Sequence, residues 1–177
     1  MRVRLFVVVA AVAASVAVFA NEAAAMGGGA CASGQVVKTT SYVFALQIGP
    51  SEQMYTAAEV KAKHPKTGEE MLSGTMAAMT MASGNTHHLE VHICNTSGSV
   101  VMGAHPSITV DDPSAKMMMM TVPIATMEGI GMGSADYHYG NNVELTAGHH
   151  ITVTVTLKGQ RAMFHAIGSK SGMAMKG

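Results

Sequence analysis

Residues 151–166, ITVTVTLKGQRAMFHA, place an apolar residue at every second position on both sides of a short turn. Such a period of two is typical of strands that bury one face. Lys158-Gly159-Gln160 predicts a hairpin between the two strands. Similar short segments recur along the chain, and no amphipathic helix of ten or more residues separates them. This argues against a parallel α/β fold and predicts an all-β protein, a single immunoglobulin-like antiparallel β-sandwich.

The other predicted elements are short. Residues 36–48 are rich in β-branched and aromatic side chains, which is typical of one strand or of a bent pair. Thr56 and Glu59 form a capping-box pattern, so a short helix or a structured loop is expected there, ending at Pro65. Further strands are expected at 69–81, 86–94, 99–103, 106–111, 115–122, 142–146, 149–158 and 160–167.

The N-terminal segment has the pattern of an export signal. Arg2 and Arg4 precede a run of apolar and small residues at 5–20, and Ala23-Ala24-Ala25 offers a cleavage site. We expect an exported protein, periplasmic or extracellular. Cleavage after Ala20 and retention of the segment as a membrane anchor are the alternatives.

Four parts of the chain are therefore expected, each with its own composition. They are a signal peptide at 1–25, a flexible Gly-rich lead-in at 26–34, the β-sandwich metal-binding domain at 35–168 and a disordered tail at 169–177.

Charge and cysteine content limit the function further. Cleavage after residue 25 removes two arginines and one glutamate, so the 11 basic and 11 acidic residues become nine and ten. A near-neutral domain gives no electrostatic reason to bind nucleic acid, and no such partner is expected. Cys31 and Cys94 are compatible with a disulfide in an oxidising compartment, and a free thiol at Cys31 is the alternative.

The segment THHLEVHIC, residues 86–94, combines apolar alternation with histidines and a glutamate. In a strand, Leu89, Val91 and Ile93 would enter the core, with His87 on their side. His88, Glu90 and His92 would share the opposite face, with neighbours about 7 Å apart. Imidazole and carboxylate groups at this spacing suit a divalent transition metal. The alternative is a solvated outer face without a ligand.

A second segment, MEGIGMGSADYHYGNNVEL at residues 127–145, adds Met127, Met132 and His138 in a Gly-rich loop before a strand. Thioethers are soft ligands that favour copper, particularly Cu(I). We expect His138 and one thioether, from Met127 or Met132, to lie opposite the first strand. His165, on the polar face of the last strand, is a further predicted ligand.

The motifs HLEVHI and HYGNNVEL together resemble the bacterial periplasmic ferrous-iron-transport accessory proteins. The resemblance implies an exported sandwich, often dimeric, that binds copper and iron and serves iron uptake beside a membrane permease. It assigns His88 and Glu90 to the strand ligands and His138 to the loop histidine, with Met132 and His165 as the nearest matches for the remaining ligands. The chain departs from the family pattern at Gly131, where the methionine is usual, and at His92, where an acidic residue is usual.

The sequence thus predicts a metal-binding protein for copper or iron, acting in metal acquisition or handling and not as an enzyme. A membrane metal permease and a second copy of the chain are the expected partners. Two alternatives remain open. One is a copper-dependent redox enzyme of the superoxide dismutase type, although the chain lacks His-x-His. The other is a structural or adhesive sandwich without a metal.

Overall fold

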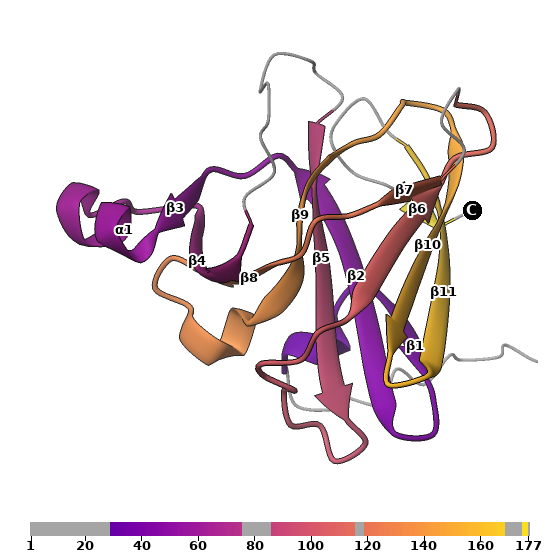
Figure 1. Cartoon of the computed structure of the whole chain (residues 1–177), viewed down its shortest axis with the longest axis horizontal. Helices are drawn as coiled ribbons and strands as arrows, with labels where there is room; N and C mark the ends of the chain where they lie inside the picture. Colours follow the sequence, from indigo (N-terminus) through magenta and orange to yellow (C-terminus); the bar gives the residue numbers. More distant parts are fainter. Residues whose placement is uncertain (1–28, 76–85, 116–118, 169–174, 177) are drawn as a thin grey trace, which may run out of the picture.

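The computed structural model describes residues 29–75, 86–115, 119–168 and 175–176. The predicted signal peptide lies outside these residues. Within them the chain forms two β-sheets packed face to face, seen edge-on in Figure 1. None of the described helices is both long enough and apolar enough to cross a membrane.

The larger sheet has seven strands, and all neighbouring pairs are antiparallel except β3 and β4, which run parallel. In spatial order its strands are β1 (Gln35–Lys38), β2 (Tyr42–Pro50), β5 (Thr86–Asn95), β9 (His138–Glu144), β8 (Ala125–Gly129), β4 (Glu69–Gly74) and β3 (Met54–Thr56).

The smaller sheet has five antiparallel strands, again given in spatial order: β12 (Met175–Lys176), β11 (Gln160–Ile167), β10 (His150–Leu157), β6 (Ser107–Asp111) and β7 (Met119–Thr121). The helical segments are the 3₁₀ turn η1 (Ala30–Ala32), helix α1 (Ala57–Lys63) and the 3₁₀ turn η2 (Gly133–Asp136). The predicted all-β sandwich is confirmed, although sheets of seven and five strands exceed a strict immunoglobulin domain.

The core lies between the two sheets and follows the predicted alternation. Leu89, Val91 and Ile93 of β5 are fully buried and pack in the same cluster as Phe164 of β11 and Val153 of β10. Because alternate residues of a strand point to opposite faces, the even-numbered residues of β5 lie on the outer face of the larger sheet.

Several local predictions can be compared with the elements. Residues 36–48 form a bent pair, β1 and β2, and α1 begins with the predicted capping box of Thr56 and Glu59. The strand expected at 142–146 begins at His138 instead, and that expected at 99–103 is reduced to one bridge between Val100 and Cys94. Strands β3 and β8 were not anticipated, because each is too short to show a period.

The ends of the domain are more structured than the sequence indicated. Residues 29–34 of the lead-in, expected to be flexible, pack on the larger sheet. Ala30 is buried, and a disulfide joins Cys31 to Cys94 of β5. In the tail, Met175–Lys176 pairs with β11 as β12, and the remaining tail residues lie outside the described ones.

Candidate metal centre

Strand register brings the polar residues of β5 and β9 together on the outer face of the larger sheet. His88 is opposite Asn142 and Glu90 is opposite Gly140. Opposed residues of paired strands share a face. His138 precedes Gly140 by two residues and Asn142 by four in β9, so its side chain lies on that face too. The prediction that His88, Glu90, His92 and His138 share one face is therefore met by their positions.

The donor atoms of these residues form two overlapping groups, either of which could hold a metal ion. In each group the donor atoms all lie within 4.8 Å of one another. The deeper group consists of Glu69, His88 and His138, all buried. The second group consists of Glu90, His92, Asp136 and His138.

His138, which both groups share, presents Nε2 to the cluster. Its Nδ1 lies 2.7 Å from the backbone oxygen of Asp136. A carbonyl oxygen only accepts, so Nδ1 carries the proton and Nε2 carries the lone pair. Burial lowers the pKa of His138 to about 4, which keeps the ring neutral at physiological pH.

His88 has the same orientation for a different reason. Its Nδ1 lies 3.0 Å from Oδ1 of Asn142. The amide of Asn142 is fixed by the backbone of Glu52, which donates its N–H to Oδ1 and accepts from Nδ2. Because Oδ1 is an acceptor, Nδ1 of His88 donates and Nε2 holds the lone pair.

The Nε2 atoms of His88 and His138 are 3.3 Å apart. When both rings are neutral, neither Nε2 carries a proton, and two lone pairs at this distance repel unless a cation lies between them. Two nitrogen ligands at about 2.0–2.1 Å from a tetrahedral ion would be about 3.3–3.4 Å apart. The spacing of the two imidazoles therefore matches a shared transition-metal ion.

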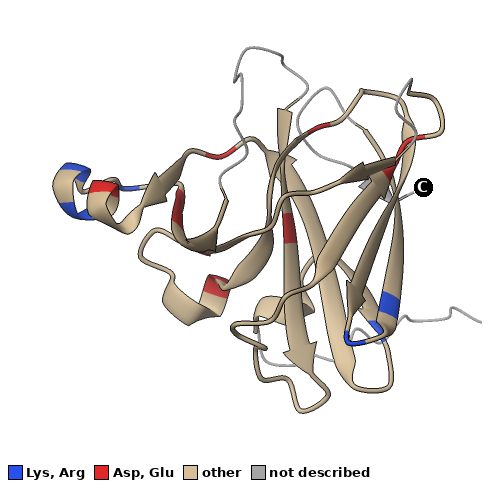
Figure 2. Ribbon diagram, in the orientation of Figure 1, with Lys and Arg blue, Asp and Glu red and all other residues tan. Residues whose placement is uncertain are grey.

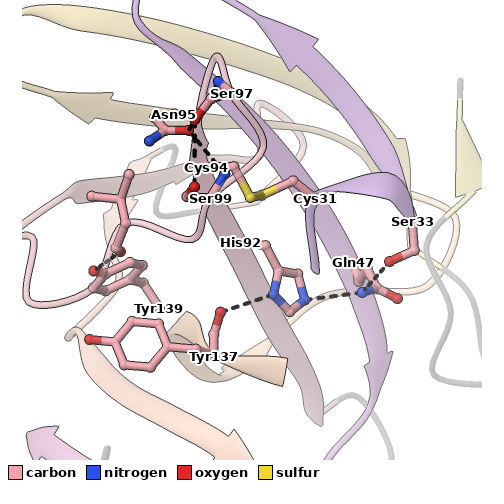
Figure 3. Close-up of a disulfide and its surroundings, with 11 residues drawn as sticks. Cys31, Ser33, Gln47, His92, Cys94, Asn95, Ser97, Ser99, Tyr137 and Tyr139 are labelled. Carbon is pink, nitrogen blue, oxygen red and sulfur yellow. Dashed lines mark hydrogen bonds between the residues drawn. A yellow bond between two sulfur atoms is a disulfide. The ribbon is translucent and has the colours of Figure 1, made fainter. Parts of the chain in front are cut away.

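His92 completes a set of three histidines. Its Nδ1 lies 3.1 Å from the backbone oxygen of Tyr137, so this ring also donates from Nδ1 and carries its lone pair on Nε2 (Figure 3). Backbone or amide oxygens that hold the non-ligating nitrogen are the usual support of metal-binding histidines.

Carboxylates surround the histidines. Glu69 at the start of β4 is buried, and its Oε2 lies 3.8 Å from Nε2 of His138 without a hydrogen-bond partner among the described residues. Burial, followed by the negative charges of Glu52, Asp136 and Glu90, raises the pKa of Glu69 to about 8. A cation placed among these groups would favour the ionised carboxylate.

Figure 2 shows the wider distribution of charge. Acidic positions on β4, β5 and η2 lie in the middle of the view, whereas the Lys and Arg positions lie on α1 and around the β10–β11 turn. Further acidic positions lie on α1 and near the end of β6, so acidic groups are not confined to the candidate centre.

Asp136 belongs to the second group and is fixed by the loop before β9. Its Oδ2 accepts a hydrogen bond from the backbone N–H of Gly129, at 3.1 Å. A Cβ at position 129 would lie 2.5 Å from Oδ2 of Asp136. The absence of a side chain at Gly129 thus allows the carboxylate to approach β8.

The other two predicted ligands take different positions. Met132 precedes η2 and is 60% exposed, although its Cγ would lie 3.1 Å from a Cβ at Gly129, on the same side as Asp136. His165 is exposed on β11, where its Nδ1 lies 3.2 Å from the hydroxyl of Thr152. Since Phe164 points into the core, His165 is on the outer face of the smaller sheet, across the sandwich from His88.

Met127, the other candidate, packs in an apolar cluster with Met54, Ala125 and Met71. It is opposite His138 in the pairing of β8 with β9, so the two residues share a face, and its side chain is fully buried. The sequence left Met127 and Met132 as alternatives. Of the two, Met127 is the one that is buried and paired with a histidine of the cluster.

Several residues of the centre were not predicted. Asp136 stands two positions before His138, a spacing that could have indicated a shared face. Glu69 begins a predicted strand, but its partner strand β8 was not anticipated, so nothing in the sequence linked it to His138. The supporting roles of Asn142 and Tyr137 depend on tertiary contacts.

Comparisons with family models, curated proteins and solved structures find no match to this chain. Function is therefore inferred from the residues and their geometry.

Proposed function

We propose that this chain is an exported protein that binds a copper or iron ion through the histidine and carboxylate groups of β4, β5 and β9, in metal acquisition or handling. The observation that carries the proposal is the 3.3 Å separation of two imidazole Nε2 atoms, both held with their lone pairs inward. No hydrogen bond between neutral rings accounts for this arrangement.

The donor set narrows the choice of ion. Imidazoles suit zinc, copper, iron and nickel, whereas Mg²⁺ and Ca²⁺ take oxygen ligands. The buried thioether of Met127 beside His138 adds a soft donor and favours copper. The resemblance of HLEVHI and HYGNNVEL to periplasmic iron-transport accessory proteins supports the same pair of metals.

Burial supports binding over catalysis. His88, His138 and His92 are each at most 1% exposed, and Glu69 is 4% exposed. An ion among these groups would be shielded from solvent, which suits storage or transfer. We propose a membrane metal permease as the partner that receives the ion, and a homodimer as the working form, on the basis of the family resemblance.

A redox enzyme is the second candidate. Glu69, His88 and His138 form a set of two histidines and one carboxylate, and such sets in iron oxygenases leave coordination positions open for oxygen. Superoxide turnover or oxygen consumption by the metal-loaded protein would favour this candidate over a carrier.

The proposal is tested by metal content and affinity. The purified mature protein is dialysed against Cu²⁺, Fe²⁺ and Zn²⁺ separately, and bound metal is measured by mass spectrometry. We expect the wild type to retain one of these ions and His138→Ala to lose it, because His138 belongs to both groups. His165→Ala is the matched control, since that histidine lies on the other outer face, and it should bind as the wild type does.

Retention of metal by His138→Ala at the wild-type level would contradict the proposal. So would a wild-type protein that binds none of the three ions, a result that would favour a structural sandwich.

A further inference from the structure

Gln47 of β2 contacts the ring of His92 from the side away from Tyr137. It is paired with Glu90 in the β2–β5 register and therefore lies on the same face as the candidate centre. Its Nε2 is 3.1 Å from Nε2 of His92 and 3.1 Å from Oγ of Ser33 (Figure 3). The amide of Gln47 thus joins a histidine of the centre to the segment that follows η1.

The direction of these hydrogen bonds follows from the partners. Because Nδ1 of His92 donates to Tyr137, Nε2 of the neutral ring can only accept. The amide N–H of Gln47 therefore donates to His92, and its second N–H donates to Ser33. In the neutral ring, the lone pair that His92 would offer to a metal ion is occupied by Gln47, and Oε2 of Glu90 lies 3.5 Å from the same nitrogen.

The two groups of donors differ in whether they need that lone pair. The group of Glu90, His92, Asp136 and His138 uses it, whereas the group of Glu69, His88 and His138 does not. His138 has one Nε2 lone pair and cannot serve both groups at once. An ion that takes His92 must displace the hydrogen bond from Gln47, and an ion in the deeper group leaves it intact.

We propose that Gln47 is a positioning residue that withholds His92 and directs the metal ion to Glu69, His88 and His138. This inference rests on the proposed metal-binding function. It deepens that function by stating which donors hold the ion and what selects them.

Two features of the lead-in hold Ser33 against Gln47. The disulfide of Cys31 with Cys94 anchors η1 to β5, two residues from His92 and on the same face. Gly34, at φ +76°, passes so close to β2 that a Cβ would lie 2.2 Å from the backbone oxygen of Leu46. Ser33 stands between these two anchors, so the orientation of the Gln47 amide is fixed by the backbone around it.

The experiment uses Cu²⁺ as the probe and counts coordinating imidazoles by pulsed EPR. We expect two imidazoles, from His88 and His138, in the wild type. Gln47→Leu keeps a similar volume but has no donor for His92, and we expect a third imidazole to bind. Gln35→Leu is the matched control, because Gln35 bonds the backbone of His165 on the smaller sheet, and it should keep two.

The metal-free protein gives an independent measurement. At pH 8 the ¹⁵N chemical shift of His92 Nε2 should be that of an unprotonated nitrogen accepting a hydrogen bond. It should move toward the free-acceptor value in Gln47→Leu and, to a smaller extent, in Ser33→Ala. In the wild type, Cu²⁺ binding at His92 must displace one neutral hydrogen bond, and in Gln47→Leu it need not. The Cu²⁺ affinity of the group that includes His92 should therefore be about three to ten times higher in Gln47→Leu than in the wild type.

The outcomes separate the two proposals. Wild-type protein that binds no Cu²⁺ overturns the proposed function itself. Three imidazoles in the wild type, two in both proteins, or a protonated Nε2 on His92 overturns the role of Gln47 while leaving metal binding in place. If Gln47→Leu does not fold, Ser33→Ala and the wild-type nitrogen shift decide the question.

Discussion

His88 and His138 come from neighbouring strands, β5 and β9, and face each other through Nε2 atoms 3.3 Å apart. The Nδ1 atom of each ring is held by a hydrogen bond. His88 donates to the side-chain amide oxygen of Asn142, and His138 donates to the backbone oxygen of Asp136. The outer face of the sheet therefore presents two lone pairs at the spacing of metal ligands. The supports of these rings matter as much for binding as the rings themselves.

The first prediction concerns Asn142. Asn142→Ala removes the acceptor that fixes Nδ1 of His88, so the ring can rotate or change tautomer. We expect metal affinity to fall about 10- to 100-fold, measured by competition with a chelator. Asn95→Ala is the control, because Asn95 also accepts hydrogen bonds, from Ser97 and Ser99, but in the turn after β5. It should reduce stability without an equal loss of affinity.

The second prediction separates the two methionines of the segment before β9. Met127→Leu should weaken Cu(I) binding, because Met127 is buried opposite His138. Met132→Leu should leave Cu(I) affinity unchanged, because Met132 is exposed at η2. Competitive Cu(I) titration with a chromogenic chelator measures both. Equal affinities in the two variants would remove the thioether from the centre.

The alternation of β5 was readable from the sequence, since apolar residues at every second position fix which side chains face the core. It correctly separated Leu89 from His88 and placed Glu90 and His92 on one face. His138 was also singled out, but in a Gly-rich loop before a strand expected at 142–146, whereas β9 begins at His138 itself. The assignments on β5 succeeded because they depend on local periodicity alone.

The wrong or missing assignments of site residues all depend on how the strands pair, which the sequence does not show. His165 was placed near the site because the sequence does not show which sheet the last strand joins. Glu69 was missed because the antiparallel pairing of β4 with β8 brings it to the face through a strand of five residues with no clear period. Met132 was the nearest match to the thioether ligand of the family resemblance, and the sequence did not show that Met127 lies in β8 opposite His138.

The third prediction concerns the disulfide. Cys31 and Cys94 are 63 residues apart in sequence, and closing a loop of that size stabilises the folded state by about 4 kcal/mol. The double variant Cys31→Ser, Cys94→Ser should lower the free energy of unfolding by about this amount in urea titration. Because the disulfide also anchors Ser33, the ¹⁵N shift of His92 should move as it does in Ser33→Ala. An unchanged shift would show that Ser33 is held by Gly34 and β2 alone.

The fourth prediction follows from the pKa of Glu69, raised to about 8 chiefly by burial. At pH 7 about nine-tenths of this carboxyl is protonated in the metal-free protein, and a metal ion requires the carboxylate. Binding should therefore release nearly one proton at pH 7, and affinity should rise with pH until about pH 8. Calorimetry in buffers of different ionisation enthalpy measures the released proton.

The free energy of unfolding of the metal-free protein should change with pH in the opposite direction to metal affinity. A carboxyl whose folded pKa exceeds its unfolded value near 4.5 contributes stability that is fully present below pH 4.5 and is lost as pH rises through about 8. Metal-free Glu69→Gln cannot ionise, so it should lose less stability than the wild type between pH 6 and pH 9. It should also release no proton on binding metal. If Glu69→Gln released as many protons as the wild type, the released proton would come from a different group. Glu69 would then be excluded as the carboxyl group from which the metal ion displaces a proton.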